Sequence, residues 1–116
     1  MSVELSLFIP VYNEEEILEQ NALKILEATK KLNLKFEIFI VDDSSTDSTP
    51  KIAKKLENQY GYFKHVRYEN GPSRRENLAQ SFRLASGDIV AFMDIDLSTD
   101  LGALPKLIGA IQNGAD

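Results

Sequence analysis

The segment Asp94-Ile95-Asp96 places two carboxylates two positions apart, directly after the apolar run 89–93. Residues i and i+2 of an extended segment point to the same side. Asp94 and Asp96 could therefore bind one hard divalent cation together, whereas without a cation they would repel each other. Ser98 follows closely enough to contact the same ion directly or through water. The competing interpretation is a pair of solvated acids that closes a strand.

A second polar cluster, residues 42–47, follows the apolar run 36–41 and has the sequence Asp-Asp-Ser-Ser-Thr-Asp. Asp42 or Asp43 could accept a hydrogen bond from a nucleobase N–H or a ribose hydroxyl. Asp and Ser also favour turns, because they hydrogen-bond to their own backbone. Taken alone, the cluster favours the turn.

A third polar stretch, Pro-Val-Tyr-Asn-Glu at 10–14, ends the first apolar run. Tyr12 could stack on a base or simply cover the end of the sheet. Asn13 is explained equally well as a helix cap, since Glu16 three residues later completes a capping box. Both alternatives stay open for both residues.

Two arginines, Arg74 and Arg75, stand in the first turn of a predicted helix. Cations oppose the helix dipole at that end, so local energetics do not account for them. A phosphate partner would account for them. Solvation of long side chains at an exposed helix start is the alternative.

Four apolar runs alternate with four helical patterns. We expect strands at 4–10, 36–41, 65–68 and 89–93, and helices at 13–31 and 105–114. A further helix should start with Thr49 as its cap and Pro50 at its first position, and another should run from Ser73, as its cap, to Gly87, which ends it. The alternation predicts an α/β fold, a Rossmann-like three-layer α/β/α arrangement with a mainly parallel sheet. The third run is shorter and more polar, so we place it at an edge and expect the strand order 3-2-1-4.

Loops that follow parallel strands lie on one edge of the sheet, because the crossovers are right-handed, and ligands of open α/β sheets bind there. The stretch 10–14, the cluster 42–47 and the Asp94/Asp96 pair should therefore converge on one site.

Composition narrows the possible chemistry. With 116 residues, 43% of them hydrophobic, the chain has the size of one globular domain or part of one. The absence of cysteine and the single histidine, His65, leave only oxygen ligands for a metal. A net charge of −5 disfavours nucleic-acid binding. No apolar run approaches the ~20 residues of a membrane segment, so we expect a cytoplasmic location.

Three segments together resemble the family 2 glycosyltransferases of GT-A fold. They are residues 9–15, residues 41–49, and residues 86–96 from Ser-Gly-Asp-Ile-Val to Asp-Ile-Asp. Within that family, residues 94–98 and 104–107 look most like polyprenyl-phosphate (dolichol-phosphate) mannose or glucose synthases. The resemblance covers essentially the whole chain, which corresponds to the N-terminal, nucleotide-sugar-binding half of such enzymes.

The resemblance implies an inverting transfer of a hexose from GDP-hexose or UDP-hexose, in this branch to a polyprenyl phosphate at the cytoplasmic face of a membrane. It implies that Asp94, Asp96 and Ser98 hold Mg²⁺ or Mn²⁺ against the diphosphate. The residues expected at the nucleotide are Pro10, Val11, Tyr12, Asn13, Glu14, Asp42, Asp43, Arg75, Asp94 and Ile95.

The sequence stops at Asp116, just after the last predicted helix, where a parallel sheet would normally continue with another strand. We therefore expect residues 1–116 to be truncated before the acceptor-binding half and the catalytic base, and to bind donor with little or no transfer. A hydrophobic fourth strand at an exposed edge would favour self-association.

Other functions share parts of this pattern. A non-catalytic nucleotide-binding or assembly module of the same fold is the main alternative, and activity of a longer chain would separate the two. A phosphoacceptor domain would place its acid pair after the first strand. A nucleotidyltransferase would carry a Gly-rich basic loop there, which this chain lacks.

Overall fold

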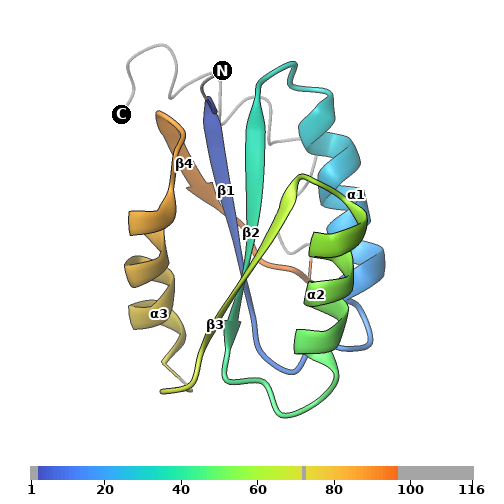
Figure 1. Cartoon of the computed structure of the whole chain (residues 1–116), viewed down its shortest axis with the longest axis vertical. Coiled ribbons are helices and arrows are strands. Elements are labelled where there is room, and N and C mark those ends of the chain that lie inside the picture. Colours follow the sequence, from blue (N-terminus) through green and yellow to red (C-terminus); the bar gives the residue numbers. More distant parts are fainter. Residues whose placement is uncertain (1–2, 72, 97–116) are drawn as a thin grey trace.

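The computed structural model describes residues 3–71 and 73–96. Its elements are, in chain order, β1 (Leu5–Val11), α1 (Leu18–Lys30), β2 (Phe36–Asp43), α2 (Thr49–Gln59), β3 (Phe63–Tyr68), α3 (Arg74–Ser81), the 3₁₀ turn η1 (Phe82–Leu84) and β4 (Ile89–Phe92). Figure 1 shows the strands between α3 on one side and α1 with α2 on the other. The predicted three-layer α/β/α arrangement is confirmed.

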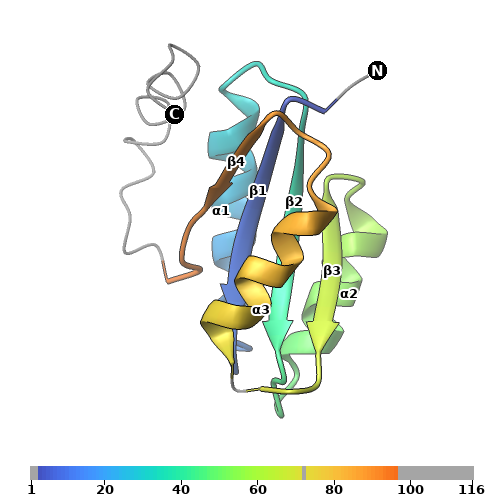
Figure 2. The same ribbon diagram turned by 90° about the vertical axis from the view of Figure 1, so that its left-hand side faces the viewer.

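The sheet has the strand order β3-β2-β1-β4, and every neighbouring pair is parallel. This is the order 3-2-1-4 expected from the sequence, with the short polar strand β3 at an edge. Because all strands run the same way, their carboxyl ends lie at one edge of the sheet, to which the arrowheads of β1, β2 and β3 point in Figure 2. Among the described strands, β4 pairs only with β1.

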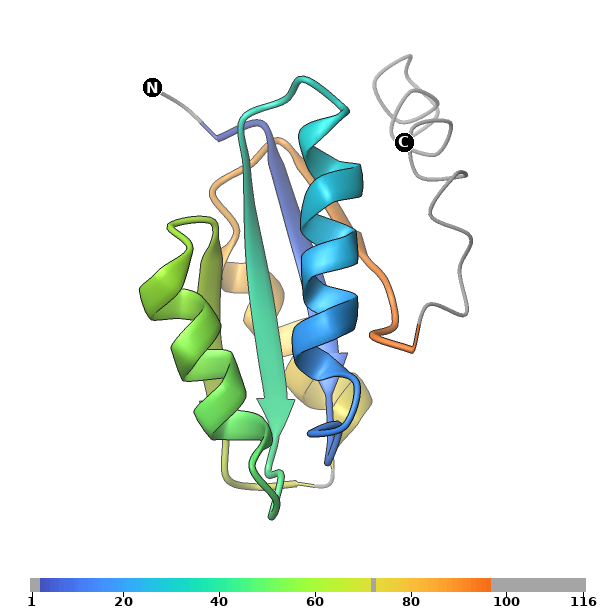
Figure 3. The same cartoon turned by 90° about the vertical axis from the view of Figure 1, so that its right-hand side faces the viewer.

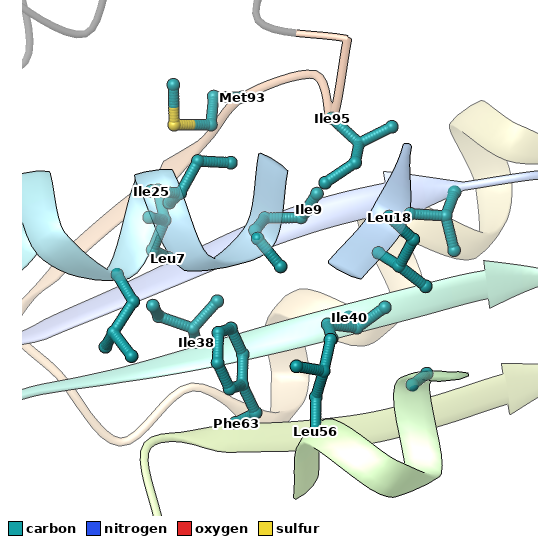
Figure 4. Close-up of a cluster of buried hydrophobic side chains, with 14 of the residues drawn as sticks. Leu7, Ile9, Leu18, Ile25, Ile38, Ile40, Leu56, Phe63, Met93 and Ile95 are labelled. Atoms are coloured by element: carbon teal, nitrogen blue, oxygen red, sulfur yellow. The ribbon is translucent and has the colours of Figure 1, made fainter. Parts of the chain in front are cut away.

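Two apolar clusters cover the two faces of the sheet. The larger one packs α1 and α2 against the sheet (Figure 3), and its buried members include Leu7, Ile9, Leu18, Ile25, Ile38, Ile40, Leu56, Phe63, Met93 and Ile95 (Figure 4). The smaller one lies under α3 (Figure 2) and contains Phe8, Phe39 and Val41, with Leu78 and Phe82 partly buried against them. Burial on both faces explains why β1 and β2 are almost continuously apolar.

Two strands are longer than the sequence predicts, because pairing with a neighbouring strand extends them, in β2 even over two residues of low strand propensity. β2 continues to Asp43, since Asp42 and Asp43 pair with Arg67 and Tyr68 of β3. β3 begins at Phe63, which pairs with Ile38. Partners on a neighbouring strand outweigh intrinsic propensity in such positions.

The predicted capping box at the start of α1 is wrong. The helix begins at Leu18, after a turn in which the Leu18 N–H donates to the Glu14 carbonyl, and no side chain caps it. Asn13 adopts a left-handed backbone with φ 51° and accepts a hydrogen bond from Thr46 N–H at 2.7 Å. The Asn13 side chain therefore bonds to the loop after β2 instead of capping α1 as the local pattern predicted.

The other helix ends also differ in detail. The N-cap of α2 is Ser48 instead of Thr49, and Ser73 precedes α3 as expected but forms no side-chain capping bond. Gly87 does not end the third helix, because η1 already stops at Leu84. The predicted helix at 105–114 lies outside the described residues.

Candidate functional site

A pocket of about 130 Å³ lies at the carboxyl edge of the sheet, where the loop after β1 meets the segment after β4. Its lining consists of Pro10, Tyr12, Glu14, Asp94, Ile95 and Asp96. Every one of these residues was expected at the site from the sequence. The volume is below the roughly 300–1,000 Å³ of a typical ligand site, so these residues would enclose only part of a drug-sized ligand.

In residues 93–96, which we call the acidic segment, buried apolar residues alternate with more exposed aspartates. The Met93 N–H donates to the Phe8 carbonyl at 3.1 Å, and Met93 and Ile95 are 3% and 2% exposed. Figure 4 shows both side chains in the cluster that contains Ile9 and Leu18. Asp94 is half-buried and Asp96 is exposed, and both line the pocket. The apolar residues thus anchor the segment while the carboxylates reach the cavity.

The donor set of the pocket suits a hard cation that arrives with a ligand. Three acidic residues, Glu14, Asp94 and Asp96, are among those that line the pocket. Within residues 3–71 and 73–96, no three or more His, Cys, Asp or Glu side chains are grouped so that they could hold an ion by themselves. Mg²⁺ typically takes one or two carboxylates together with phosphate oxygens and waters, so the residues fit such a metal. Ser98, the third predicted ligand, lies outside the described residues.

The loop after β1 is clamped to the loop after β2. Asn13 N–H donates to Ser45 Oγ at 2.9 Å, and its side-chain oxygen accepts from Thr46 N–H. Glu14 N–H donates to Thr49 Oγ1 at 2.8 Å. Further bonds join Glu15 N–H to Asp47 and Ser48 N–H to the Glu15 carboxylate. The cluster 42–47 therefore helps to hold Tyr12 and Glu14 in place.

Asp42 points toward the α1/α2 side of the sheet and is fully buried. It accepts a hydrogen bond from Ser45 N–H at 3.1 Å and one from Arg67 Nη1 at 2.6 Å. Arg67 also binds Glu69, and hydrogen bonds to Glu69 and Asp42 raise the pKa of Arg67. Asp42 thus joins the loop after β2 to β3.

Asp43 points the other way, toward α3. Its carboxylate accepts hydrogen bonds from Ser73 N–H and from Asn77 Nδ2, the latter at 2.6 Å. A negative charge is favourable at a helix N-terminus, so Asp43 stabilises the start of α3. Gly71 packs against this carboxylate so closely that a Cβ would lie 2.5 Å from Asp43 Oδ1.

Several residues predicted at the nucleotide lie outside the pocket lining. Val11 is 3% exposed and belongs to the core. Asn13, Asp42 and Asp43 are bonded to other loops, as described above. Arg75 is exposed on α3.

Sequence reasoning missed two polar residues that organise the site. Arg67 lies on β3 and binds Asp42, but nothing in its local pattern indicates this. Asn21 lies on the apolar stripe of α1 and donates to the Ile95 carbonyl at 2.9 Å. A polar residue on an otherwise buried stripe needs a partner, and this signal could have identified Asn21.

Comparison with known proteins gives consistent results. The model of the family "Glycosyl transferase family 2" matches residues 6–116. A dolichol-phosphate mannosyltransferase from Pyrococcus furiosus is 39% identical over 114 residues, which are 98% of this chain and 32% of the relative. The chain therefore spans about a third of the length of that curated relative.

Two solved structures share the fold. A mannosyltransferase from Pyrobaculum calidifontis in complex with GDP-Man and Mn²⁺ superposes with a TM-score of 0.71 at 26% identity, over 83% of this chain and 28% of that one. Glucosyl-3-phosphoglycerate synthase from Mycobacterium tuberculosis with UDP gives a TM-score of 0.73 at 26% identity, over 97% and 41% of the two chains. Together with the family match and the strand order, these similarities show that the chain belongs to glycosyl transferase family 2 and has the architecture of its GT-A neighbours.

Proposed function

We propose that this chain is the donor-binding part of a metal-dependent, inverting glycosyltransferase that transfers a hexose from a nucleotide diphosphate sugar. The observation that carries the proposal is one pocket, lined by Tyr12, Glu14, Asp94 and Asp96, at the carboxyl edge of a family 2 sheet. An aromatic ring beside oxygen donors suits a nucleoside joined to a metal-bound diphosphate.

The solved relatives support both the donor class and the metal. One was crystallised with GDP-Man and Mn²⁺, and another with UDP. We therefore propose GDP-hexose or UDP-hexose as the donor and Mg²⁺ or Mn²⁺ as the cofactor of this chain.

The roles follow from where the side chains lie. Pro10, Tyr12 and Glu14 would border the nucleoside, with Tyr12 stacking on the base, while Asp94 and Asp96 would hold the cation. Ser98 as a further ligand and Arg75 as a phosphate contact stay predictions. That Asp42 or Asp43 holds the base or ribose also stays a prediction. In the structure Asp42 accepts a hydrogen bond from Ser45 in the loop after β2, and Asp43 accepts one from Asn77 of α3.

The chemistry explains why carboxylates are needed at this place. As the bond from the anomeric carbon to the diphosphate breaks, negative charge grows on the leaving oxygen. A bound divalent cation would neutralise that charge. Asp94 and Asp96 would orient the donor through the cation, and the buried Ile95 would keep both carboxylates in place. Direct attack by the acceptor inverts the anomeric centre, with the catalytic base expected outside residues 1–116.

The acceptor is proposed from a relative. The similar Pyrococcus protein is a dolichol-phosphate mannosyltransferase, which supports a polyprenyl phosphate as the acceptor. Work at the cytoplasmic face of a membrane stays a prediction. In the part of the chain that the structure describes, no helix has the length and apolar character needed to cross a bilayer.

The test is calorimetric titration of the chain with GDP and with UDP, each with and without Mn²⁺. We expect binding that depends on Mn²⁺ for one of the two nucleotides. Asp96→Ala should weaken it by more than about 100-fold, beyond the loss typical of a residue that only supports a ligand. Asp88→Ala is the matched control, since it removes an exposed carboxylate just before β4, at the opposite end of that strand.

Two results would contradict the proposal. Nucleotide binding that is indifferent to Mn²⁺ would favour the non-catalytic nucleotide-binding module. Equal losses in the Asp96 and Asp88 variants would mean that the effect is one of overall charge.

A further inference from the structure

A buried amide on α1 is the starting point. Asn21 is 8% exposed and lies on the stripe that also carries Leu18, Ala22 and Ile25. Burying an amide is unfavourable unless it forms hydrogen bonds. The Asn21 Nδ2 donates to the Ile95 carbonyl at 2.9 Å, a contact between residues 74 positions apart.

The position of that carbonyl is informative, because in the sequence Ile95 stands between Asp94 and Asp96, the two aspartates that line the pocket. β4 ends at Phe92, and the Met93 N–H bond to Phe8 is the last contact of the segment with the backbone of β1 among the bonds of the described residues. Beyond it, the Ile95 side chain is held in the core and the Ile95 carbonyl is held by Asn21. Core packing and the hydrogen bond from Asn21 thus both fix Ile95, the residue between Asp94 and Asp96.

The same helix is joined to the opposite wall of the pocket. The Leu18 N–H at the start of α1 donates to the carbonyl of Glu14, which lines the pocket, and the Asn21 N–H donates to the Ile17 carbonyl. The first turn of α1 is therefore a short, hydrogen-bonded link between Glu14 and Ile95.

We propose that Asn21 is a positioning residue for the metal: its amide fixes the Ile95 peptide so that Asp94 and Asp96 present their carboxylates to one cation. The proposal rests on the metal role given under Proposed function. Asn21 does not line the pocket and acts through Ile95. Partners of this kind, which orient metal ligands without touching the metal, strongly affect metal affinity.

The test compares Asn21→Leu with Thr29→Val. Both changes remove one buried side-chain hydrogen bond from α1, since the Thr29 hydroxyl donates to the Ile25 carbonyl at 2.7 Å within the helix. Only Asn21 contacts the acidic segment. The probe is Mn²⁺ alone, titrated into the chain while paramagnetic broadening of the Asp94 and Asp96 amide signals is followed by NMR. This readout detects weak binding and needs neither nucleotide nor activity.

We expect Asn21→Leu to require at least about 10-fold more Mn²⁺ for half-maximal broadening, as for other ligand-orienting partners. Thr29→Val should keep the wild-type titration although its unfolding midpoint falls. Asn21→Ala, which removes the amide without adding volume, takes the place of Asn21→Leu if that variant does not fold.

Three outcomes would overturn the proposal, and they are distinguishable. A wild-type Mn²⁺ titration in the Asn21 variants would show that the bond to Ile95 has no role in metal binding. Equal weakening in Thr29→Val would show a general effect of destabilising α1. Absence of any Mn²⁺ effect in the wild-type chain, both with Mn²⁺ alone and with GDP or UDP added, would overturn the metal site itself, and the positioning role with it.

Discussion

Gly87 shows how a single residue can serve a different purpose from the one its local pattern indicates. A Cβ at this position would lie 2.9 Å from the carbonyl carbon of Glu4 and from backbone atoms of Leu5. The Gly87 N–H donates to the Ser6 hydroxyl at 2.9 Å. The glycine therefore allows the chain entering β4 to approach the start of β1, and the sheet needs that close contact.

The first prediction concerns this contact. Gly87→Ala should lower the free energy of unfolding by roughly 1–3 kcal/mol, because the atoms in the way belong to backbone and cannot move independently. Gly61→Ala is the control, since nothing lies within 4 Å of its Cβ position. Urea unfolding should show Gly61→Ala unchanged or slightly stabilised. Equal stability of the two variants would mean that β1 and the segment before β4 separate easily.

At the scale of elements, Glu37 joins three strands and a loop. It lies on β2 at 3% exposure and accepts hydrogen bonds from Ser6 Oγ of β1 at 2.6 Å, Lys64 Nζ of β3 at 2.8 Å and Ser86 N–H at 2.8 Å. Burial opposes its charged form, but the hydrogen bonds from Lys64, Ser6 and Ser86 prevail and lower the pKa of Glu37. The carboxylate is therefore more stable in the folded chain than in the unfolded one.

The second prediction follows from the sign of that shift. A carboxyl whose folded pKa is lowered adds stability above its unfolded pKa of about 4.5, and this stability is lost as the pH falls from there through the folded pKa. Glu37→Gln should lose about 1.5–3 kcal/mol at pH 7 and should show a smaller further loss below pH ~4.5.

Urea unfolding at a series of pH values between neutral and strongly acidic conditions would measure this. Glu27→Gln is the matched control, because Glu27 is an exposed residue whose ion pair with Lys30 has an N–O distance of 3.8 Å. If the free energy of unfolding of Glu37→Gln fell with pH in parallel with that of the wild-type chain throughout the acidic range, the prediction would be contradicted.

At the scale of the whole molecule, the edge strand β4 carries exposed apolar side chains. Val90 and Phe92 are 40% and 57% exposed, and among the described strands β4 pairs only with β1. Leu84 of η1 is exposed as well. α3 packs over the apolar side chains of β1, β2 and β3, while Val90 and Phe92 of β4 remain accessible beside it.

The third prediction is that this chain self-associates through β4 at high concentration, since apolar edge strands are sites of intermolecular pairing. Sedimentation should show a mass that rises with concentration, and Phe92→Lys should shift the chain toward monomer. Tyr62→Lys provides the control, because it changes another exposed aromatic residue that lies just before the opposite edge strand, β3. A wild-type monomer throughout the concentration range would contradict the prediction.

The sequence by itself determined the class of fold, the strand order and the edge of the sheet where the candidate pocket lies. Hydrophobic runs and helical periodicity are local properties, and a parallel sheet brings all its carboxyl ends together whatever the details. For this reason Pro10, Tyr12, Glu14, Asp94 and Asp96 were predicted together and line one pocket.

The tertiary structure alone decided what each remaining polar residue contacts. Asn13 serves the loop after β2 instead of capping α1, Asp42 and Asp43 turn to opposite faces of the sheet, and Asn21 reaches Ile95. Each of these bonds joins residues 25 or more positions apart, although Asp42 also accepts a bond from Ser45 nearby. A hydrogen bond forms only between groups within about 3 Å, and sheet register and helix packing, not local pattern, bring such distant groups to that distance.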